Sequence, residues 1–383
     1  MNYLLKYGEI ALRGKNRHLF EDKLIKQVIK CTNARVSKEQ GRLLAREVTD
    51  QKLLENIIGI TAICPVDIIT TDEIEAIKEL VLNHVLEKFE EEFTFKIVTK
   101  RANKNYPLTS PEINIEIGAH ILENIKGAVV DVKNPQHTIY VELRNNVYCY
   151  SEIIKGIGGL PSGAGRVISL LSGGIDSPVA TFLAARKGLD VTPLYFHAPP
   201  YTTEHAKQKV VDICKNLSKY MGDIELHIVN FTDIQLFLHK NTQHEKLTIF
   251  LKRAMVLLAE ELSKKQRANA LIMGDSIGQV ASQTIQSIDV IDDAAKNIPI
   301  IRPLATNDKQ EIVEIAKKIG TFDISIRPFE DCCTIFVAKH PETKPDKRTI
   351  KRMEAAFEEE LMQKINIAIE NIEILKINSI GGI

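Results

Sequence analysis

A short glycine-rich turn between an expected strand and an expected helix constrains this chain more than any other feature. Residues 167–171 form an apolar run typical of a buried strand, the sequence Ser-Gly-Gly-Ile-Asp-Ser follows at 172–177, and a helical pattern comes next. Glycines allow a tight turn that brings backbone N–H groups close to an anion, and the N-terminus of the next helix adds partial positive charge. A plain Gly-Gly connection is the alternative, but the hydroxyls of Ser172 and Ser177 beside the Asp176 carboxylate favour a phosphate-binding turn.

This turn differs from the common GxxxxGK[ST] phosphate loop because no lysine closes it. It resembles the SGGxDS signature of the PP-loop ATP pyrophosphatases, which cleave ATP between its α- and β-phosphates. The resemblance implies ATP as a substrate and release of pyrophosphate. Asp176 could hold the Mg²⁺ that accompanies the phosphates, directly or through water.

Composition narrows the class of protein and its cellular setting. A chain of 383 residues, 44% hydrophobic and 26% charged, is expected to form two or three globular domains. It contains no apolar run of about eighteen residues, so we expect no membrane span. Its six cysteines show no CxxC or CxxH spacing, which favours a reducing, cytoplasmic setting without a structural metal site.

The net charge of zero conceals a basic N-terminal segment. Residues 1–60 carry twelve Lys and Arg against seven Asp and Glu, whereas residues 61–160 carry ten against fifteen. A basic segment suits a polyanion partner. A solvated charged surface is the alternative, and charge alone leaves both open.

The apolar pattern divides the chain into four segments. Residues 1–58 alternate strands and a helix as a small α+β domain does, and residues 59–156 repeat that style. Five glycines and a proline within eleven residues mark a linker, which we place at 157–165. From 166 to 383, continuous apolar strands alternate with helices, which predicts an α/β domain with a doubly wound parallel sheet. Residues 348–374 are expected to form a helix followed by a short tail.

Four loops that follow expected strands would meet at one edge of that sheet, where open α/β sheets bind ligands. They span residues 172–177, 195–200, 273–283 and 302–309. Each could be a plain connection, but together they indicate one nucleotide site. Lys309 could reach the α-phosphate as negative charge builds there, or it could be a surface lysine in the first turn of a helix.

Two residue pairs outside these loops are also candidates. Lys252 and Arg253 lie on a long expected helix and could reach a phosphate or the ribose, but a solvated helix face explains them too. Cys332 and Cys333 form an adjacent pair in a polar loop. A cysteine is often a small buried hydrophobic residue, whereas a thiolate in a polar loop could carry a persulfide.

Several separated segments resemble the tRNA 4-thiouridine synthetases, a family of tRNA sulfurtransferases that is also tied to thiamine biosynthesis. Residues 6–17 are similar to the family's N-terminal ferredoxin-like domain, and residues 100–113 are similar to its THUMP domain, an RNA-binding module. The four loops are similar to those of its PP-loop domain. The resemblance implies an α/β PP-loop domain preceded by two α+β domains, in a short form without a rhodanese domain.

The resemblance also implies roles for individual residues. Asp176 and Lys309 would serve activation, and Cys332 would be the catalytic cysteine, with Cys333 leaving that register ambiguous by one residue. The expected ATP-binding residues are Leu170, Leu171, Ser172, Gly173, Gly174, Ser177, Tyr195, Phe196, Lys252, Arg253, Gly274 and Gln283. The expected RNA-binding cations of the first two domains are Arg13, Lys15, Arg17, Lys100, Arg101 and Lys104.

The implied reaction uses ATP and Mg²⁺ to adenylate O4 of uridine 8 in tRNA, after which a cysteine persulfide attacks C4 and displaces AMP. A cysteine desulfurase would supply the sulfur, either directly to Cys332 or through a separate rhodanese-like carrier. Certain relatives bind an iron–sulfur cluster through a CxxC motif that this chain lacks. The family also implies a homodimer. The alternatives are another PP-loop tRNA thiolase, a PP-loop ligase, or a non-catalytic RNA-binding protein.

Overall fold

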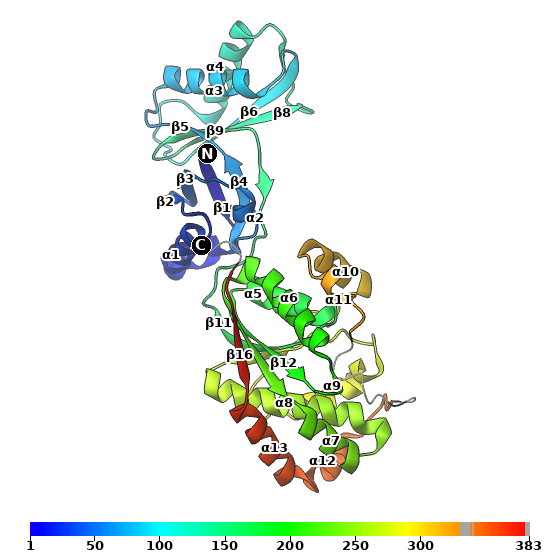
Figure 1. Ribbon diagram of the computed structural model, residues 1–383. Coiled ribbons are helices and arrows are strands. Elements are labelled where there is room, and N and C mark those ends of the chain that lie inside the picture. Colours follow the sequence, from blue (N-terminus) through cyan, green and yellow to red (C-terminus); the bar gives the residue numbers. More distant parts are fainter. Residues whose placement is uncertain (330–337, 339–340, 380–383) are drawn as a thin grey trace. The chain divides into compact units, whose positions relative to one another are not determined.

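The computed structural model describes residues 1–329, 338 and 341–379, which divide into two compact units, Met1–Leu160 and Pro161–Ile383 (Figure 1). Cys332 and Cys333, the predicted sulfur carriers, lie outside the described residues. None of the helices in the described ranges is long and apolar enough to cross a bilayer.

The first sheet of the N-terminal unit is antiparallel, with strand order β10-β4-β1-β3-β2. Its strands are β1 (Tyr3–Tyr7), β2 (Arg35–Glu39), β3 (Arg42–Arg46), β4 (Ile60–Pro65) and β10 (Ile154–Lys155). The accompanying helices are η1 (Glu9–Leu12), η2 (Gly14–Asn16), α1 (Arg17–Thr32) and α2 (Lys52–Glu55). Leu24 and Val28 of α1 pack with Leu5 and Ile63 of the sheet. Because β4 and β10 both belong to this sheet, the predicted boundaries after residues 58 and 156 do not coincide with its limits, and they stay predictions.

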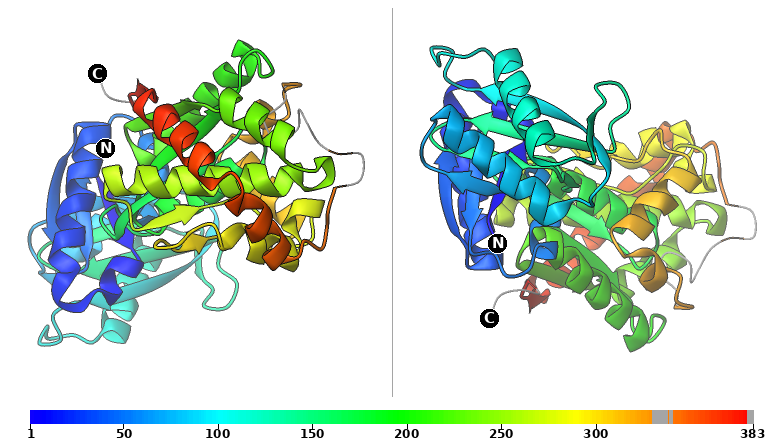
Figure 2. Two further views of the ribbon diagram at one scale, coloured as in Figure 1. Left: turned by 90° about the horizontal axis from the view of Figure 1, so that it is seen from below. Right: turned by 90° about the horizontal axis from the view of Figure 1, so that it is seen from above.

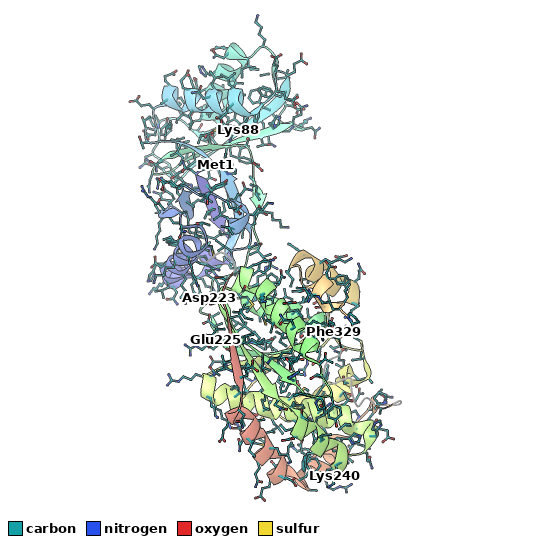
Figure 3. The ribbon with its side chains drawn as sticks, viewed as in Figure 1. Met1, Lys88, Asp223, Glu225, Lys240 and Phe329 are labelled. Carbon is teal, nitrogen blue, oxygen red and sulfur yellow. The ribbon has the colours of Figure 1, made fainter. Side chains whose placement is uncertain are left out.

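The second sheet of this unit is mixed, with order β5-β9-β8-β6-β7, and β6 pairs in parallel with β7 and β8. Its strands are β5 (Asp67–Ile69), β6 (Phe93–Arg101), β7 (Ala128–Val130), β8 (His137–Leu143) and β9 (Val147–Tyr150). Two helices cover one face, α3 (Ile74–Lys88) and α4 (Ser110–Asn124). Lys88, labelled in Figure 3, is the last residue of α3. A capping box formed by Thr109 and Glu112 begins α4.

The sheet of the C-terminal unit has the order β15-β14-β11-β12-β13-β16. Its strands are β11 (Gly165–Leu171), β12 (Leu189–His197), β13 (Ile224–Asn230), β14 (Ala270–Ile272), β15 (Ile300–Ile301) and β16 (Glu373–Ile377). The pairings from β11 to β15 are all parallel. The chain runs outward from β11 to β13 and then returns to the other side of β11 at β14. This order confirms the predicted doubly wound sheet, and its switch point lies between β11 and β14.

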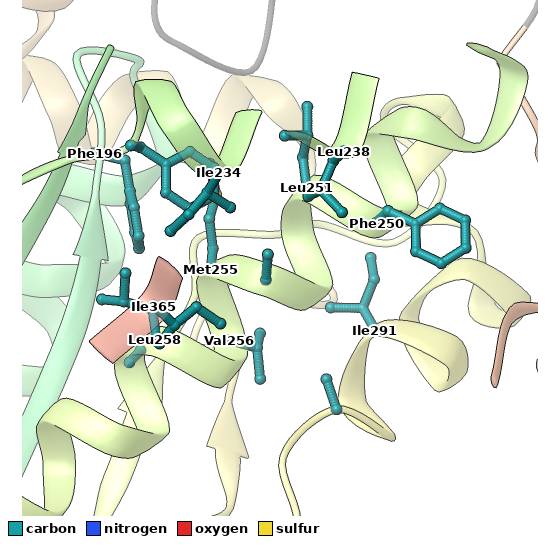
Figure 4. Close-up of a cluster of buried hydrophobic side chains, with 14 of the residues drawn as sticks. Phe196, Ile234, Leu238, Phe250, Leu251, Met255, Val256, Leu258, Ile291 and Ile365 are labelled. Atoms are coloured by element: carbon teal, nitrogen blue, oxygen red, sulfur yellow. The ribbon is translucent and has the colours of Figure 1, made fainter. Parts of the chain in front are cut away.

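Helices cover both faces of this sheet (Figures 1 and 2). One face carries α5 (Asp176–Arg186) and α6 (Glu204–Met221), which contact α10 (Lys309–Lys318) and α11 (Phe322–Ser325). The other face carries α7 (Thr232–Asn241), η3 (His244–Lys246), α8 (Leu247–Gln266), η4 (Ala281–Gln283), α9 (Ile285–Asp292), α12 (Lys347–Ala355) and α13 (Glu358–Glu370). Figure 4 shows the core on this side, where Met255 and Leu258 of α8 lie among side chains such as Phe196 and Ile365.

The C-terminal end of the chain differs from the expectation of one helix and a tail. The structure has two helices, α12 and α13, followed by β16, which pairs antiparallel with β13. Asp223 and Glu225, labelled in Figure 3, bind this strand region, because Asp223 accepts a hydrogen bond from the Ser379 amide at 3.0 Å and Glu225 lies 3.7 Å from Lys376 Nζ. An edge strand with one buried residue carries no alternating apolar pattern, so the sequence does not reveal it.

Candidate active site

A pocket opens at the carboxyl ends of the central strands, at the switch point between β11 and β14. Its cavity volume is about 200 Å³. Its lining comprises Leu170, Leu171, Ser172, Gly174, Asp176, Ser177, Tyr195, Phe196, Lys252, Met255, Met273, Gly274, Asp275 and Gln283. Three of the four predicted loops therefore meet here, and the fourth contributes through Arg302 and Lys309.

The glycine-rich turn closes on itself through its two serines. The Ser172 amide donates to Ser177 Oγ at 2.8 Å, and the two hydroxyl oxygens lie 3.0 Å apart. The Gly174 amide donates to Ser172 Oγ at 3.3 Å, and Ser325 Oγ of α11 donates to the Gly174 carbonyl at 3.1 Å. The turn is thus held rigidly at the N-terminus of α5, where backbone N–H groups and the helix dipole favour a phosphate.

Gly274 brings the loop after β14 against this turn. A Cβ atom built on Gly274 would lie 2.8 Å from both the backbone nitrogen and the Cα of Ser177. Such a contact is shorter than real side chains make, and backbone atoms cannot rotate away from it. Only glycine therefore allows the two loops to form one wall of the pocket.

Asp176 is the first residue of α5 and has both carboxylate oxygens engaged. Lys309 Nζ donates to Oδ1 at 2.6 Å, and Gln279 Nε2 donates to Oδ2 at 3.0 Å. Lys309 begins α10 and keeps about half of its side chain exposed. The fold thus joins the two residues predicted to serve activation, although they are 133 positions apart.

A buried group of charges supports the pocket behind this pair. Asp275 accepts hydrogen bonds from Lys252 Nζ at 2.9 Å, Arg302 Nε at 3.1 Å and Gln283 Nε2 at 3.3 Å. Burial by itself would raise the pKa of Asp275, but the charges of Lys252 and Arg302 hold it below its usual value. Arg302 also binds Asp292 with two hydrogen bonds, at 2.6 and 2.8 Å.

Asp275 did not stand out in the sequence, although its position three residues after β14, in the predicted loop 273–283, is a usable signal. Since its carboxylate is already engaged by three donors, it holds Lys252 and Gln283 in place. Gln283 Oε1 is buried and has no hydrogen-bond partner among the described residues, so it can accept a hydrogen bond from a ligand in the pocket.

Most predicted ATP-binding residues meet at this pocket, but Arg253 does not. Gly173 lies in the turn between two lining residues. Arg253 is 2% exposed, and its guanidinium faces away from the lining, where it binds the Glu354 carboxylate and the Val290 carbonyl oxygen. This burial contradicts a solvated helix face. Arg253 anchors α12 to α8, and any contact with ATP stays a prediction.

The predicted RNA-binding cations fall into two groups. Arg13, Lys15, Lys100 and Lys104 are exposed. Arg17 is engaged by Glu21 and the Tyr7 hydroxyl, at 2.7 and 2.5 Å, and Arg101 donates to the carbonyl oxygens of Tyr106 and Leu108. Arg17 thus links α1 to β1, and Arg101 holds the loop after β6, which carries Lys104.

Three family models match successive parts of the chain. The model of the ThiI ferredoxin-like domain matches residues 2–64, that of the THUMP domain matches 71–151, and that of the thiamine biosynthesis protein (ThiI) matches 162–359. This is the domain order that the sequence predicts.

Relatives of known name extend over nearly the whole chain. A probable tRNA sulfurtransferase of Lachnoclostridium phytofermentans is 47% identical, over 98% of this chain and 99% of the relative. One of Acetivibrio thermocellus is also 47% identical, over 98% of each. A solved complex of a 4-thiouridine synthetase with RNA and bound ATP superposes with a TM-score of 0.89 at 37% identity, covering 98% of this chain and 99% of the other.

Proposed function

The chain belongs to the thiamine biosynthesis protein (ThiI) family and is an enzyme of the tRNA sulfurtransferase class, and from this premise we propose that it converts uridine 8 of tRNA to 4-thiouridine with ATP. The observation that carries the proposal is the pairing of the phosphate-binding turn with Asp176 and Lys309 at the mouth of one pocket. Such a site suits a nucleotide whose phosphates lie on the turn and whose base lies among apolar side chains.

The residues of the pocket suit the two ends of ATP. Tyr195, Phe196 and Met255 supply apolar surface for an adenine, and the unpaired Gln283 Oε1 can accept a hydrogen bond from an amino or hydroxyl group. The amides of the turn and the N-terminus of α5 face the phosphates. Lys252 and Lys309 bring positive charge to the polyphosphate.

The Asp176 carboxylate fits Mg²⁺, which prefers carboxylate and phosphate oxygens. Asp275, the other carboxylate in the lining, is already saturated by Lys252, Arg302 and Gln283. When bound, Mg²⁺ would offset the charge of the pyrophosphate leaving group. Lys309 would leave Asp176 and stabilise negative charge at the α-phosphate during adenylation of O4.

Sulfur transfer would follow adenylation. Adenylation replaces a poor leaving oxygen with AMP, so that the terminal sulfur of a cysteine persulfide can attack C4 and expel AMP. The base is then joined to the cysteine by an S–S bond, and a second thiol would attack the cysteine sulfur, form a disulfide with it and release 4-thiouridine. We assign the persulfide to Cys332, with Cys333 as the neighbouring alternative, on the family pattern alone. A cysteine desulfurase would load it directly or through a rhodanese-like carrier, in the cytoplasm, and the same persulfide would serve thiamine thiazole synthesis. A homodimer is part of the proposal.

The test combines the protein with ATP, Mg²⁺, unmodified tRNA, a cysteine desulfurase and cysteine, followed by mass spectrometry of nucleosides and a pyrophosphate assay. We expect 4-thiouridine with the wild type, and its loss in either Cys332→Ala or Cys333→Ala. Cys31→Ala, which removes a half-buried cysteine in the other unit, is the control and should stay active. Release of pyrophosphate without a thiolated base would contradict the assigned substrate. Appearance of 2-thiouridine would favour the other class of PP-loop thiolase.

A further inference from the structure

Helix α12 presents two pairs of cations that differ in their surroundings. Lys347 Nζ lies 2.6 Å from Asp289, and Lys351 Nζ lies 3.3 Å from Asp293. Both acidic residues belong to α9 or follow it directly, so this lysine pair fastens α12 to α9. Each of these two lysines therefore has a carboxylate partner in or next to α9.

The other cations of this segment have no such role. Lys344, Arg348 and Arg352 are exposed, and within the part of the chain that the structure describes no carboxylate lies within ion-pair distance of their side chains. The acidic residues nearest in sequence are already engaged, because Asp346 accepts from the Thr349 amide and hydroxyl at 2.8 and 2.7 Å and Glu354 binds Arg253. We call these three cations the α12 basic face.

The α12 basic face belongs to the same scaffold as the pocket. The hydroxyl of Thr284, which follows the lining residue Gln283, donates to the Thr343 carbonyl at 2.7 Å. On α8, Lys252 lines the pocket while its neighbour Arg253 holds Glu354 of α12. Ile350 anchors the helix in the core. Helix α8 and the loop that carries Gln283 therefore contact both the pocket and the segment that bears the α12 basic face.

We propose that the α12 basic face is an RNA contact of the catalytic unit, where Lys344, Arg348 and Arg352 bind backbone phosphates of the tRNA beside the ATP pocket. The inference rests on the proposed function. Phosphate contacts fix register and orientation without reading sequence, which is what an enzyme needs to bring one base to a fixed pocket. Val280 and Ile285, 52% and 58% exposed, stand before and after η4, which carries Gln283, and they offer apolar surface to an unstacked base.

Helix stability does not explain these cations. Arg348 stands in the first turn of α12, where the helix dipole opposes a positive charge, whereas the carboxylate of the N-cap residue Asp346 attracts Arg348 and Arg352. Because these two exposed effects oppose each other, removal of Arg348 should change the free energy of unfolding by less than about 1 kcal/mol. That makes the α12 basic face testable without loss of the fold.

The test compares Arg348→Gln/Arg352→Gln with Lys265→Gln/Lys318→Gln, which removes two other exposed cations of the same unit. Lys265 is at the far end of α8, about 27 Å along the helix from Leu247. The start of α8 is the end near α12, because the Glu245 carbonyl oxygen accepts a hydrogen bond from the Glu342 amide, shortly before α12. We expect the arginine variant to weaken tRNA binding roughly tenfold and to reduce the slope of log K against log salt by about two. Arg348→Lys/Arg352→Lys should restore most of that slope.

The outcomes separate this inference from the proposed function. If the wild type yields no 4-thiouridine, the proposed function fails. If the wild type is active but the arginine variant binds tRNA with the affinity and salt slope of the lysine control, the α12 basic face is not an RNA contact. If the variant binds tRNA normally and loses activity with a desulfurase but keeps it with inorganic sulfide, the face binds a protein sulfur donor and the inference is overturned.

Discussion

At the scale of single residues, Gly274 and Asp275 show how adjacent positions serve one pocket in different ways. Gly274 contributes the absence of a side chain, because the Ser177 backbone occupies the space that a Cβ would need. Asp275 contributes a buried charge that holds Lys252 and Arg302. The first effect is steric and the second is electrostatic. Substitution of Gly274 should therefore lower mainly the ATP affinity, and substitution of Asp275 mainly the stability.

Gly274→Ala should lower ATP affinity at least tenfold, because the loop after β14 must move away from the turn, while overpacking costs about 1–3 kcal/mol of stability. Calorimetric ATP titration and urea denaturation measure the two effects. Gly118→Ala is the matched control, since it sits inside α4 and no atom lies within 4 Å of the position that a Cβ would take there. The control should be stabilised by up to about 1 kcal/mol. Normal ATP binding by Gly274→Ala would show that the close approach is not needed.

Asp275→Asn should destabilise the protein by about 3–5 kcal/mol, because it removes the buried anion that pairs with the partly buried Lys252 and Arg302. The lowered pKa of Asp275 means that its contribution is present above about pH 4 and is lost as the pH falls further. Asp289→Asn removes the exposed partner of Lys347 and should cost less than about 1 kcal/mol. Equal losses at pH 7 in the two variants would argue against a special role of burial.

At the scale of elements, the parallel strands β12 and β13 bury two histidines in the central sheet. His227 is 1% exposed within β13, and His197 ends β12 with Nδ1 2.9 Å from Thr202 Oγ1. Burial lowers the pKa of both below the usual value of about 6.5. The unfolded chain therefore binds more protons than the folded chain at mildly acidic pH, and the strands become less stable as pH falls through 6.5.

His227→Leu should flatten this pH dependence. Between pH 7.5 and 5.5, we expect the wild type to lose more stability than the variant, by roughly 1 kcal/mol per pH unit below the unfolded pKa. Thermal denaturation of both proteins at several pH values measures this difference in stability. His18→Leu, at an exposed position in the other unit, should keep the wild-type slope. A variant that loses stability as steeply as the wild type would contradict the assignment to His227.

At the scale of the whole molecule, the two sheets of the N-terminal unit are joined by a buried cluster of charged side chains around Glu142, which we call the charged joint. Glu142 of β8 is 1% exposed and lies 3.9 Å from Lys6 of β1 and 3.6 Å from Arg42 of β3. Arg144 and the Tyr150 hydroxyl complete its shell at 2.6 and 2.8 Å. Apolar residues surround this joint, Leu4, Leu44, Cys64, Val66, Tyr148 and Tyr150. The two sheets therefore form one body that can present the exposed cations of both to a single RNA.

Glu142→Gln should uncouple the two sheets, because three cations would then face one another without a buried anion. We expect a loss of about 3–5 kcal/mol and a broadened or split transition of the N-terminal unit in calorimetry. Asp22→Asn, which removes an exposed partner of Lys38, is the control and should change little. A single sharp transition at the wild-type temperature would contradict the role of Glu142.

The sequence by itself determined the features whose physics is local. The turn at 172–177 is defined by six adjacent residues between a strand and a helix, so it can be predicted as a phosphate-binding turn without the fold. The doubly wound sheet follows from continuous apolar strands alternating with helices, and the family from the order of its segments. In each case, neighbours along the chain carry the information.

Only the tertiary structure decided which charged residues, distant in the sequence, form pairs. Asp275 meets Lys252 across 23 positions, Arg253 meets Glu354 across 101, and Asp176 meets Lys309 across 133. No local pattern records such pairs, because desolvation of a charge and the distance to its counterion depend on packing between elements. For the same reason the sequence does not distinguish the adjacent residues Lys252 and Arg253, although Lys252 lines the pocket and Arg253 is buried against Glu354.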